Sequence, residues 1–199
     1  MQGSESLQLA GERLHFIGVL GSGMRKLATY AAERGADVSG SDIRGSSEAE
    51  ELEEKGIDVR IGQQDSRLDA DISMVIASQA INCSNPELRQ ARRMGLDVLK
   101  YPEFLGLLMQ EQRGIAVAGT HGKSTTSSIM AYLMEEGGLD PSFIIGARVP
   151  QLGGGARCGD SPHLVAEACE YKRSFLYMEP TVGLVTNIDM DHLDYYRDM

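Results

Sequence analysis

Residues 119–125 (GTHGKST) have the types and spacing of a phosphate-binding loop. The apolar segment before them, residues 114–118 (GIAVA), is typical of a short buried strand. A helix is predicted to begin at Lys123, so unpaired backbone N–H groups and the positive end of the helix dipole would point to one place. Lys123 would add a full charge beside the β- and γ-phosphates of a nucleotide, and Ser124 would offer a hydroxyl to Mg²⁺.

The match to the common pattern G-x-x-x-x-G-K-[ST] is incomplete, because Val117 stands where the first glycine is expected. The competing interpretation is a plain strand–turn–helix connection with a solvated lysine. The apolar strand before the loop and the amphipathic helix after it favour phosphate binding. We expect this helix to end at Gly137 and Gly138 and to carry one apolar side, formed by Ile129, Met130, Leu133 and Met134.

A second glycine-containing loop, residues 18–23 (GVLGSG), lies between a predicted strand (14–19) and a predicted helix (24–34). Its spacing is G-x-x-G-x-G rather than the dinucleotide pattern G-x-G-x-x-G. Asp42 follows the next predicted strand, where a ribose-binding acid is expected. The pattern indicates a nucleotide-type ligand such as a UDP group; the alternative is a tight turn with a surface aspartate. An NAD-dependent dehydrogenase is disfavoured, because a phosphate loop follows further along the chain.

Predicted strands and helices alternate along the chain, which indicates an α/β fold with parallel sheets. The polar residues 110–113 (QEQR) precede a fresh strand that carries its own phosphate loop, so we expect a domain boundary there. The prediction is a Rossmann-like parallel-sheet N-terminal domain at 12–110 and the start of a P-loop ATPase domain at 113–199. Residues 153–155 (GGG) are expected to lie in a loop.

Composition narrows the class of protein. The chain has 199 residues and a net charge of −10, which disfavours a nucleic-acid partner. No apolar run reaches the roughly 18 residues of a membrane span, and the N-terminus lacks an apolar signal region, so no membrane insertion is expected. The three cysteines show no C-x-x-C spacing and fit a reducing cytoplasm. The sequence gives no indication of oligomeric state.

Four motifs follow one another along the chain. They are HFIGVLGSGM (15–24) with SGSD (39–42), SQAI (78–81) with NPE (85–87), GTHGKST (119–125), and AEACE (166–170) with TNIDMDH (186–192). In this order they resemble the Mur ligase family, and any one of them alone would be a weak signal. The phosphate loop of that family shows the same departure at the position of Val117.

The resemblance implies ATP-dependent joining of L-alanine to the carboxylate of UDP-N-acetylmuramate through an acyl phosphate, with ATP and Mg²⁺ as cofactors. It implies catalytic roles for Lys123, Glu167 and His192, and Mg²⁺ contacts from Ser124, Glu167 and His192. It implies ATP contacts from Gly119, Thr120, His121, Gly122, Lys123, Ser124, Thr125 and Asn187. The implied UDP-sugar contacts are Gly18, Gly21, Ser22, Gly23, Ser41, Asp42 and Ser78.

Each implied role has a simpler alternative. Glu167 would otherwise be a solvated acid at a strand end, and Glu170 either assists or forms a surface salt bridge. His192 would otherwise start a helix or fill the core, and His121 would only fill the turn. The neighbours Asp189 and Asp191 would then cap a helix.

The chain also departs from the family pattern. Leu20 replaces a glycine common in the first loop, and Cys169 and Tyr171 replace an acidic residue and a serine of many members. Family members are larger, with three domains, so we expect an N-terminal portion with a truncated ATPase domain. Three competing functions stay open: a ligase that attaches a whole peptide to UDP-muramate, a non-catalytic UDP-sugar-binding fragment, and a generic P-loop ATPase or GTPase.

Overall fold

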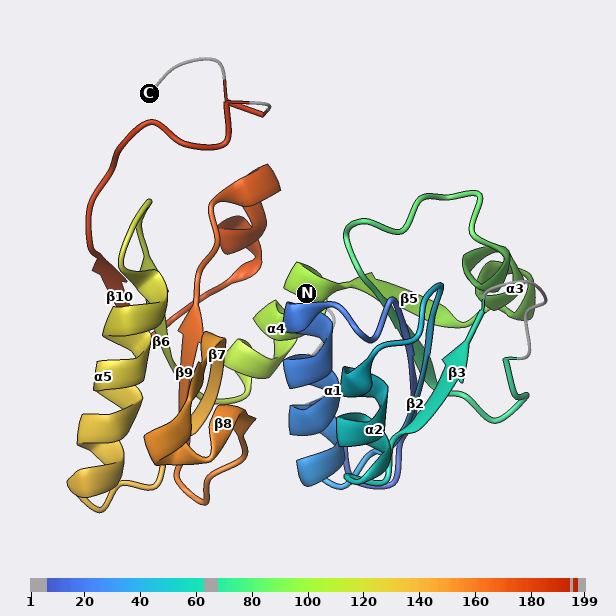
Figure 1. Cartoon of the computed structure of the whole chain (residues 1–199), viewed down its shortest axis with the longest axis horizontal. Coiled ribbons are helices and arrows are strands. Elements are labelled where there is room, and N and C mark those ends of the chain that lie inside the picture. Colours follow the sequence, from blue (N-terminus) through green and yellow to red (C-terminus); the bar gives the residue numbers. More distant parts are fainter. Residues whose placement is uncertain (1–6, 63–67, 194, 197–199) are drawn as a thin grey trace, which may run out of the picture. The chain divides into compact units, whose positions relative to one another are not determined.

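The computed structural model describes residues 7–62, 68–193 and 195–196. The chain divides into two compact units, Met1–Phe104 and Leu105–Met199. Each unit is built around one five-stranded sheet, and strands alternate with helices in both (Figure 1). The predicted α/β class with a Rossmann-like parallel sheet is therefore confirmed.

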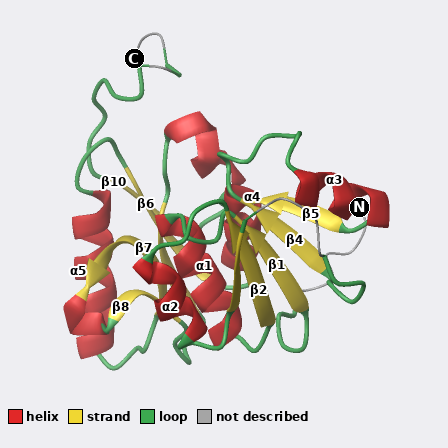
Figure 2. Cartoon of the chain, turned by 45° about the vertical axis from the view of Figure 1, so that its right-hand side comes forward, coloured by secondary structure: helices red, strands yellow, loops and turns green. Residues whose placement is uncertain are grey.

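All strand pairs of the first unit are parallel, in the order β3-β2-β1-β4-β5. The chain crosses the sheet in one direction from β1 to β3 and in the other from β4 to β5. Right-handed crossovers therefore place α1 and α2 on one face of the sheet (Figure 2) and α3 on the other. The elements are β1 (Arg13–Ile17), α1 (Ser22–Glu33), β2 (Asp37–Asp42), α2 (Ser47–Glu53), β3 (Asp58–Ile61), β4 (Met74–Ala77), α3 (Pro86–Met94) and β5 (Asp97–Lys100). Helix α4 (Tyr101–Gln110) follows, and it begins in the first unit and ends in the second.

Helix α3 begins and ends where its sequence predicts. Pro86 occupies the first turn, where its missing N–H costs nothing, and the Asn85 side chain accepts a hydrogen bond from Leu88 N. Gly95 ends the helix in the left-handed conformation, with φ 74°. These local signals set where the helix begins and ends, and packing of Leu88 and Ala91 against the sheet stabilises it.

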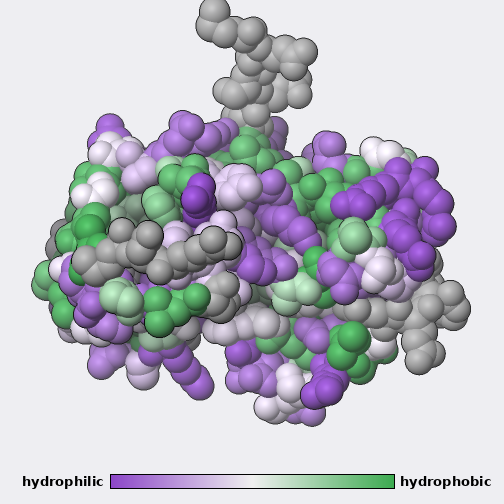
Figure 3. Space-filling model, turned by 90° about the horizontal axis from the view of Figure 1, so that it is seen from above, coloured by the Kyte–Doolittle hydropathy of each residue, from purple (hydrophilic) through white to green (hydrophobic). Residues whose placement is uncertain are grey.

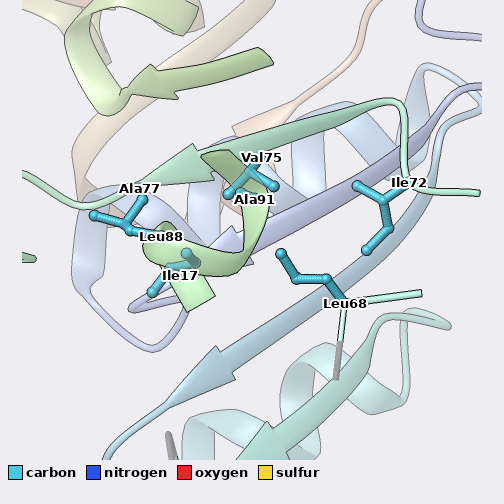
Figure 4. Packing of buried hydrophobic residues seen from close by; sticks show 7 residues of the cluster. All are labelled: Ile17, Leu68, Ile72, Val75, Ala77, Leu88 and Ala91. Carbon is cyan, nitrogen blue, oxygen red and sulfur yellow. The ribbon is translucent and has the colours of Figure 1, made fainter. Parts of the chain in front are cut away.

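The core of the first unit follows the two-residue period of the strands. Ile17, Val75 and Ala77 pack with Leu88 and Ala91 of α3 (Figure 4). Because neighbouring strand residues point to opposite faces, Phe16 lies on the other face, against Phe104 at 6.1 Å between ring centroids. Both faces of the parallel sheet are thus buried, as such sheets require.

The sheet of the second unit has the order β10-β6-β9-β7-β8. Its pairs are parallel, except that β7 and β8 form an antiparallel hairpin. Strand β6 lies between β9 and β10 (Figure 1). The elements are β6 (Arg113–Ala118), α5 (Lys123–Glu136), β7 (Ser142–Val149), η1 (Pro150–Leu152), β8 (Gly154–Arg157), β9 (His163–Glu167), η2 (Tyr171–Tyr177) and β10 (Val182–Val185).

Two expectations for the second unit were wrong. Gly154 and Gly155 belong to β8 rather than to a loop, because pairing with β7 supplies an order that the glycine-rich sequence does not signal. Of the predicted apolar side of α5, Met130 and Met134 do pack on the core together with Ala131, whereas Ile129 and Leu133 are 54% and 61% exposed. The buried stripe of α5 is therefore rotated from the one that its apolar residues suggest.

The surface drawn in Figure 3 mixes hydrophilic and hydrophobic residues, as the surfaces of globular proteins do. On the face drawn in Figure 3, hydrophilic and hydrophobic side chains alternate in small groups. Among the described helices, none combines the length and the apolar content that crossing a membrane requires.

Candidate nucleotide and substrate sites

Three neighbouring parallel strands bring the predicted phosphate loop and its partners to one edge of the second sheet. The loop follows β6, and in register Val117 lies beside Glu167 of β9 while Ala118 lies beside Val185 of β10. The segments after β9 and β10 therefore begin at the same edge as the loop. Ligands of α/β folds bind at this carboxyl edge.

The loop is fixed by residues that directly follow β10. Thr120 N donates to Asn187 O at 3.2 Å, and His121 N donates to Asn187 Oδ1 at 3.0 Å. In return, Asn187 Nδ2 and Thr186 Oγ1 donate to His121 O at 2.9 and 2.6 Å. The N–H groups of Thr120 and His121 are thus engaged, whereas those of the first turn of α5 have no intrahelical acceptor and can bind an anion.

Two glycines give the loop its shape. Gly119 has φ 130°, and a Cβ there would overlap the Thr186 hydroxyl and approach Asn187 O to 3.0 Å. Gly122 caps α5 in the left-handed conformation, with φ 83°, and a Cβ there would meet nothing within 4 Å. Close approach therefore requires glycine at 119, and only backbone conformation favours it at 122.

Lys123 folds back over its own loop. Its Nζ donates to Gly119 O at 2.5 Å and to Thr120 O at 3.1 Å. It also forms an ion pair with Glu170, at 3.0 Å to Oε2 and 3.1 Å to Oε1. The predicted phosphate-binding cation is thus held at the loop by two carbonyl groups and one carboxylate.

Glu170 also joins His192 to this group. His192 Nε2 lies 3.5 Å from Glu170 Oε1, and the His192 ring packs against Tyr171 at 4.8 Å between centroids. Single donor atoms of Cys169, Glu170 and His192 lie within 4.8 Å of one another. The structure thus brings Lys123 and His192 together through Glu170.

The oxygens predicted to hold Mg²⁺ belong to two elements of this edge. Ser124 is the second residue of α5 and Thr125 the third, and Glu167 ends β9, with its carboxylate accepting a hydrogen bond from Gly146 N. A hydroxyl and a carboxylate fit the preference of Mg²⁺ for oxygen. Cys169 fits it poorly, because burial, the largest cause, raises the pKa of its thiol and keeps it protonated.

The glycine loop of the first unit follows β1 and is held by the end of β2. Gly18 N and Val19 N both donate to Ser41 O, at 2.8 and 3.0 Å. The Asp42 carboxylate accepts a hydrogen bond from Leu20 N at 3.0 Å and so helps to hold the glycine loop. Gly21 then caps α1, which begins at Ser22 and Gly23. The residues predicted to contact a UDP group are therefore gathered around one strand–loop–helix turn.

Gly18 and Ser78 are also brought together. Gly18 has φ 80°, and a Cβ there would lie 3.1 Å from Ser78 Cβ. The Ser78 carbonyl accepts from Lys100 Nζ at 3.3 Å. The end of β4 thus meets the loop that follows β1, which is the point where the strand order of this sheet reverses.

A buried polar network beneath this loop was not predicted. The Ser41 hydroxyl donates to Glu87 Oε2 at 2.5 Å, and His15 Nε2 lies 3.8 Å from Glu87 Oε1. His15 Nδ1 lies 2.9 Å from Ser39 Oγ. Ser41, Glu87 and His15 are all less than a tenth exposed. The motifs HFIGVLGSGM and NPE contain His15 and Glu87, but their spacing alone does not reveal that the two meet.

Comparisons with known proteins agree with this architecture. The family model "Mur ligase family, catalytic domain" matches residues 13–113, and "Mur ligase middle domain" matches residues 117–199. A UDP-N-acetylmuramate--L-alanine ligase of Clostridium kluyveri is 43% identical over 96% of this chain, and one of Carboxydothermus hydrogenoformans is 45% identical over 92%. The chain spans 42% and 40% of the length of these two relatives.

Solved structures give the same result. A UDP-N-acetylmuramate:L-alanyl-gamma-D-glutamyl-meso-diaminopimelate ligase from Neisseria meningitides matches 95% of this chain and 64% of its own, with a TM-score of 0.86 and 30% identity. A UDP-N-acetylmuramate-alanine ligase from Thermotoga maritima matches 94% of this chain and 44% of its own, with a TM-score of 0.84 and 28% identity. The family models together match nearly the whole chain from Arg13 onward, and the chain belongs to the Mur ligase family.

Proposed function

We propose that this chain carries the UDP-sugar site and the ATP phosphate site of a ligase that joins L-alanine to the carboxylate of UDP-N-acetylmuramate. The observation that carries the proposal is the presence of two strand–loop–helix sites, one at the carboxyl edge of each sheet. The names of the relatives from C. kluyveri and C. hydrogenoformans support these substrates. We assign the UDP-sugar site to a domain at 12–110 and the ATP site to a domain at 113–199.

In the ATP site, Lys123 and the N–H groups of the first turn of α5 would bind the β- and γ-phosphates. Thr186 and Asn187 would hold the loop in shape through the hydrogen bonds described above, which favours a fixed position for the reacting phosphate. Ser124 and Glu167 would supply oxygen ligands to Mg²⁺, and bound Mg²⁺ would neutralise phosphate charge. We assign His192 to the same site, where Glu170 links it to Lys123.

In the UDP-sugar site, the loop around Gly18 would receive the diphosphate, as in other doubly wound sheets. The carboxylate of Asp42 would serve the loop and the ribose together. Its two oxygens accept from Leu20 N and from Ile43 N, and the remaining lone pairs of the ionised carboxylate would accept from a ribose hydroxyl. The acyl phosphate formed from the sugar carboxylate would then be attacked by the amine of L-alanine. The exposed thiol of Cys83 agrees with a reducing compartment, so we place the reaction in the cytoplasm.

A second candidate is a ligase that attaches a peptide to UDP-muramate. The structural likeness to the N. meningitides enzyme favours it. A third candidate is a module that binds UDP-sugar without turnover, for which the strand–loop–helix site of the first unit would be enough by itself.

Measuring the release of inorganic phosphate distinguishes the three candidate functions. With ATP, Mg²⁺ and UDP-N-acetylmuramate present, release that depends on L-alanine supports the proposed reaction. Release that depends on the peptide L-alanyl-γ-D-glutamyl-meso-diaminopimelate supports the second candidate. UDP-sugar binding with no release in either mixture supports the third and contradicts catalysis by this chain.

A further inference from the structure

The ammonium group of Lys123 has no donor left for a phosphate. An ammonium carries three N–H donors. Among the described residues, Gly119 O, Thr120 O and the Glu170 carboxylate provide three acceptors for it. A nucleotide phosphate that binds Lys123 directly must therefore take the place of one of these three groups.

The two carbonyl groups are poor candidates for displacement. They belong to the loop that Thr186 and Asn187 hold through several hydrogen bonds. Moving either carbonyl away from Lys123 would require the whole loop to change shape. The Glu170 carboxylate, by contrast, stands at the end of a side chain that can adopt another rotamer.

The environment of Glu170 also favours its release. Its Oε2 atom is buried and accepts no hydrogen bond in the described part of the chain, although it lies 3.0 Å from Lys123 Nζ. His192 offers the carboxylate a second basic partner besides Lys123, because its Nε2 atom lies 3.5 Å from Glu170 Oε1. A phosphate arriving beside Lys123 would repel the carboxylate, because both are negatively charged.

We propose that Glu170 is a positioning residue that occupies Lys123 in the empty site and is exchanged for phosphate when a nucleotide binds. The inference rests on the proposed ATP site. In the empty site, the Glu170 carboxylate takes the place of the phosphate and keeps the Lys123 side chain folded over the loop. On binding, Lys123 exchanges one anionic partner for another, so the Glu170 ion pair opposes nucleotide binding.

The test is calorimetric titration of the full 199-residue chain with ATP in the presence of EDTA, so that no metal contributes. Glu170→Gln removes the charge and keeps the size of the side chain. The exchange predicts that E170Q binds metal-free ATP about fivefold more tightly than the unmodified chain, the gain expected when one ion pair no longer has to be broken. Glu179→Gln is the matched control, because it removes one exposed carboxylate from the same unit.

A second pair of variants separates the exchange from a general change in charge. In the Lys123→Ala background, which should not bind ATP, adding E170Q should restore no binding, because there is no ammonium group to free; a general effect of removing one negative charge would restore part of it. Circular dichroism checks that each variant is folded. Affinity of E170Q equal to or weaker than that of E179Q would overturn the exchange while leaving the ATP site intact. An unmodified chain and an E170Q variant that both fail to bind ATP would overturn the proposed ATP site and the exchange with it.

Discussion

At the scale of single residues, the phosphate loop depends on two glycines for different reasons. Gly119 has no space for a Cβ beside Thr186 and Asn187, whereas Gly122 has open space and only an unusual backbone angle. The sequence pattern does not separate these two roles, because G-T-H-G-K shows both positions as glycine. Only the packing of residues after β10 against the loop distinguishes them.

We expect Gly119→Ala to destabilise the fold by more than Gly122→Ala. The first substitution forces apart the loop and the segment around Thr186 and should cost about 3 kcal/mol. The second places alanine in the left-handed conformation and should cost about 1 kcal/mol. Urea unfolding followed by circular dichroism measures both free energies. Equal effects of the two substitutions would show that contact with Thr186 does not constrain residue 119.

The role of Asn187 shows where residue-level prediction ends. The resemblance to the Mur ligase family implied an ATP contact for it. In the structure it donates to and accepts from His121, which is 66 residues away in sequence. Sequence spacing cannot reveal such a contact, because it depends on β10 pairing with β6.

At the scale of elements, the alternation of strands and helices predicted the parallel sheets, and capping residues predicted α3. The prediction was wrong where tertiary packing overrides local pattern. The glycines of β8 carry no strand signal, and the apolar residues of α5 do not all face the sheet. Both errors occur where a neighbouring strand determines what is buried.

Beneath the first glycine loop, Glu87 of α3 accepts a hydrogen bond from Ser41, so we propose that α3 supports the proposed UDP-sugar site. We expect Glu87→Ala to weaken binding of UDP-N-acetylmuramate about tenfold, equivalent to about 1.4 kcal/mol. The physical reason is that Ser41, whose carbonyl holds Gly18 N and Val19 N, would lose the acceptor of its buried hydroxyl. Calorimetry measures the affinity.

Asn85→Ala is the matched control for this prediction. It removes the N-cap of the same helix and should cost about 1 kcal/mol of stability, while the Glu87 carboxylate that accepts from Ser41 is retained. Its affinity for the UDP-sugar should therefore stay close to that of the unmodified chain. A loss of affinity as large in N85A as in E87A would mean that α3 acts only through general stability.

The end of α5 is linked to β8 by a pair whose strength depends on pH. Arg157 donates to both carboxylate oxygens of Glu135, at 3.1 and 2.5 Å, and this hydrogen bonding is the main cause that lowers the pKa of Glu135 from 4.5. A carboxyl group whose pKa is lowered by folding stabilises the fold above its unfolded pKa. That stabilisation is lost as the pH falls through the folded pKa.

We therefore expect Arg157→Gln to reduce the loss of stability on acidification below pH 4.5. Urea midpoints at neutral pH and in acid measure this loss. The exposed Arg148 offers a control, and Arg148→Gln should leave the dependence on acid as it is in the unmodified chain. If R157Q and the unmodified chain lose the same stability in acid, the Glu135–Arg157 pair does not contribute to the acid dependence of folding stability.

At the scale of the whole molecule, the chain combines two α/β units, each with a glycine-containing loop at the carboxyl edge of its five-stranded sheet. The order of four short motifs indicated the family, which the family models and the relatives confirm. The positions of the loops followed from strand order. The hydrogen bonds that hold them did not, because they join residues far apart in sequence.

The central claim is that UDP-sugar and ATP bind at separate sites in the two units. Calorimetric titration with UDP-N-acetylmuramate, and then with ATP and Mg²⁺, tests it when the unmodified chain is compared with Lys123→Ala. We predict that the unmodified chain binds both ligands, and that K123A loses ATP binding but keeps its affinity for the UDP-sugar. Parallel loss of both ligands in a folded K123A chain, or failure of the unmodified chain to bind the UDP-sugar, would contradict the account.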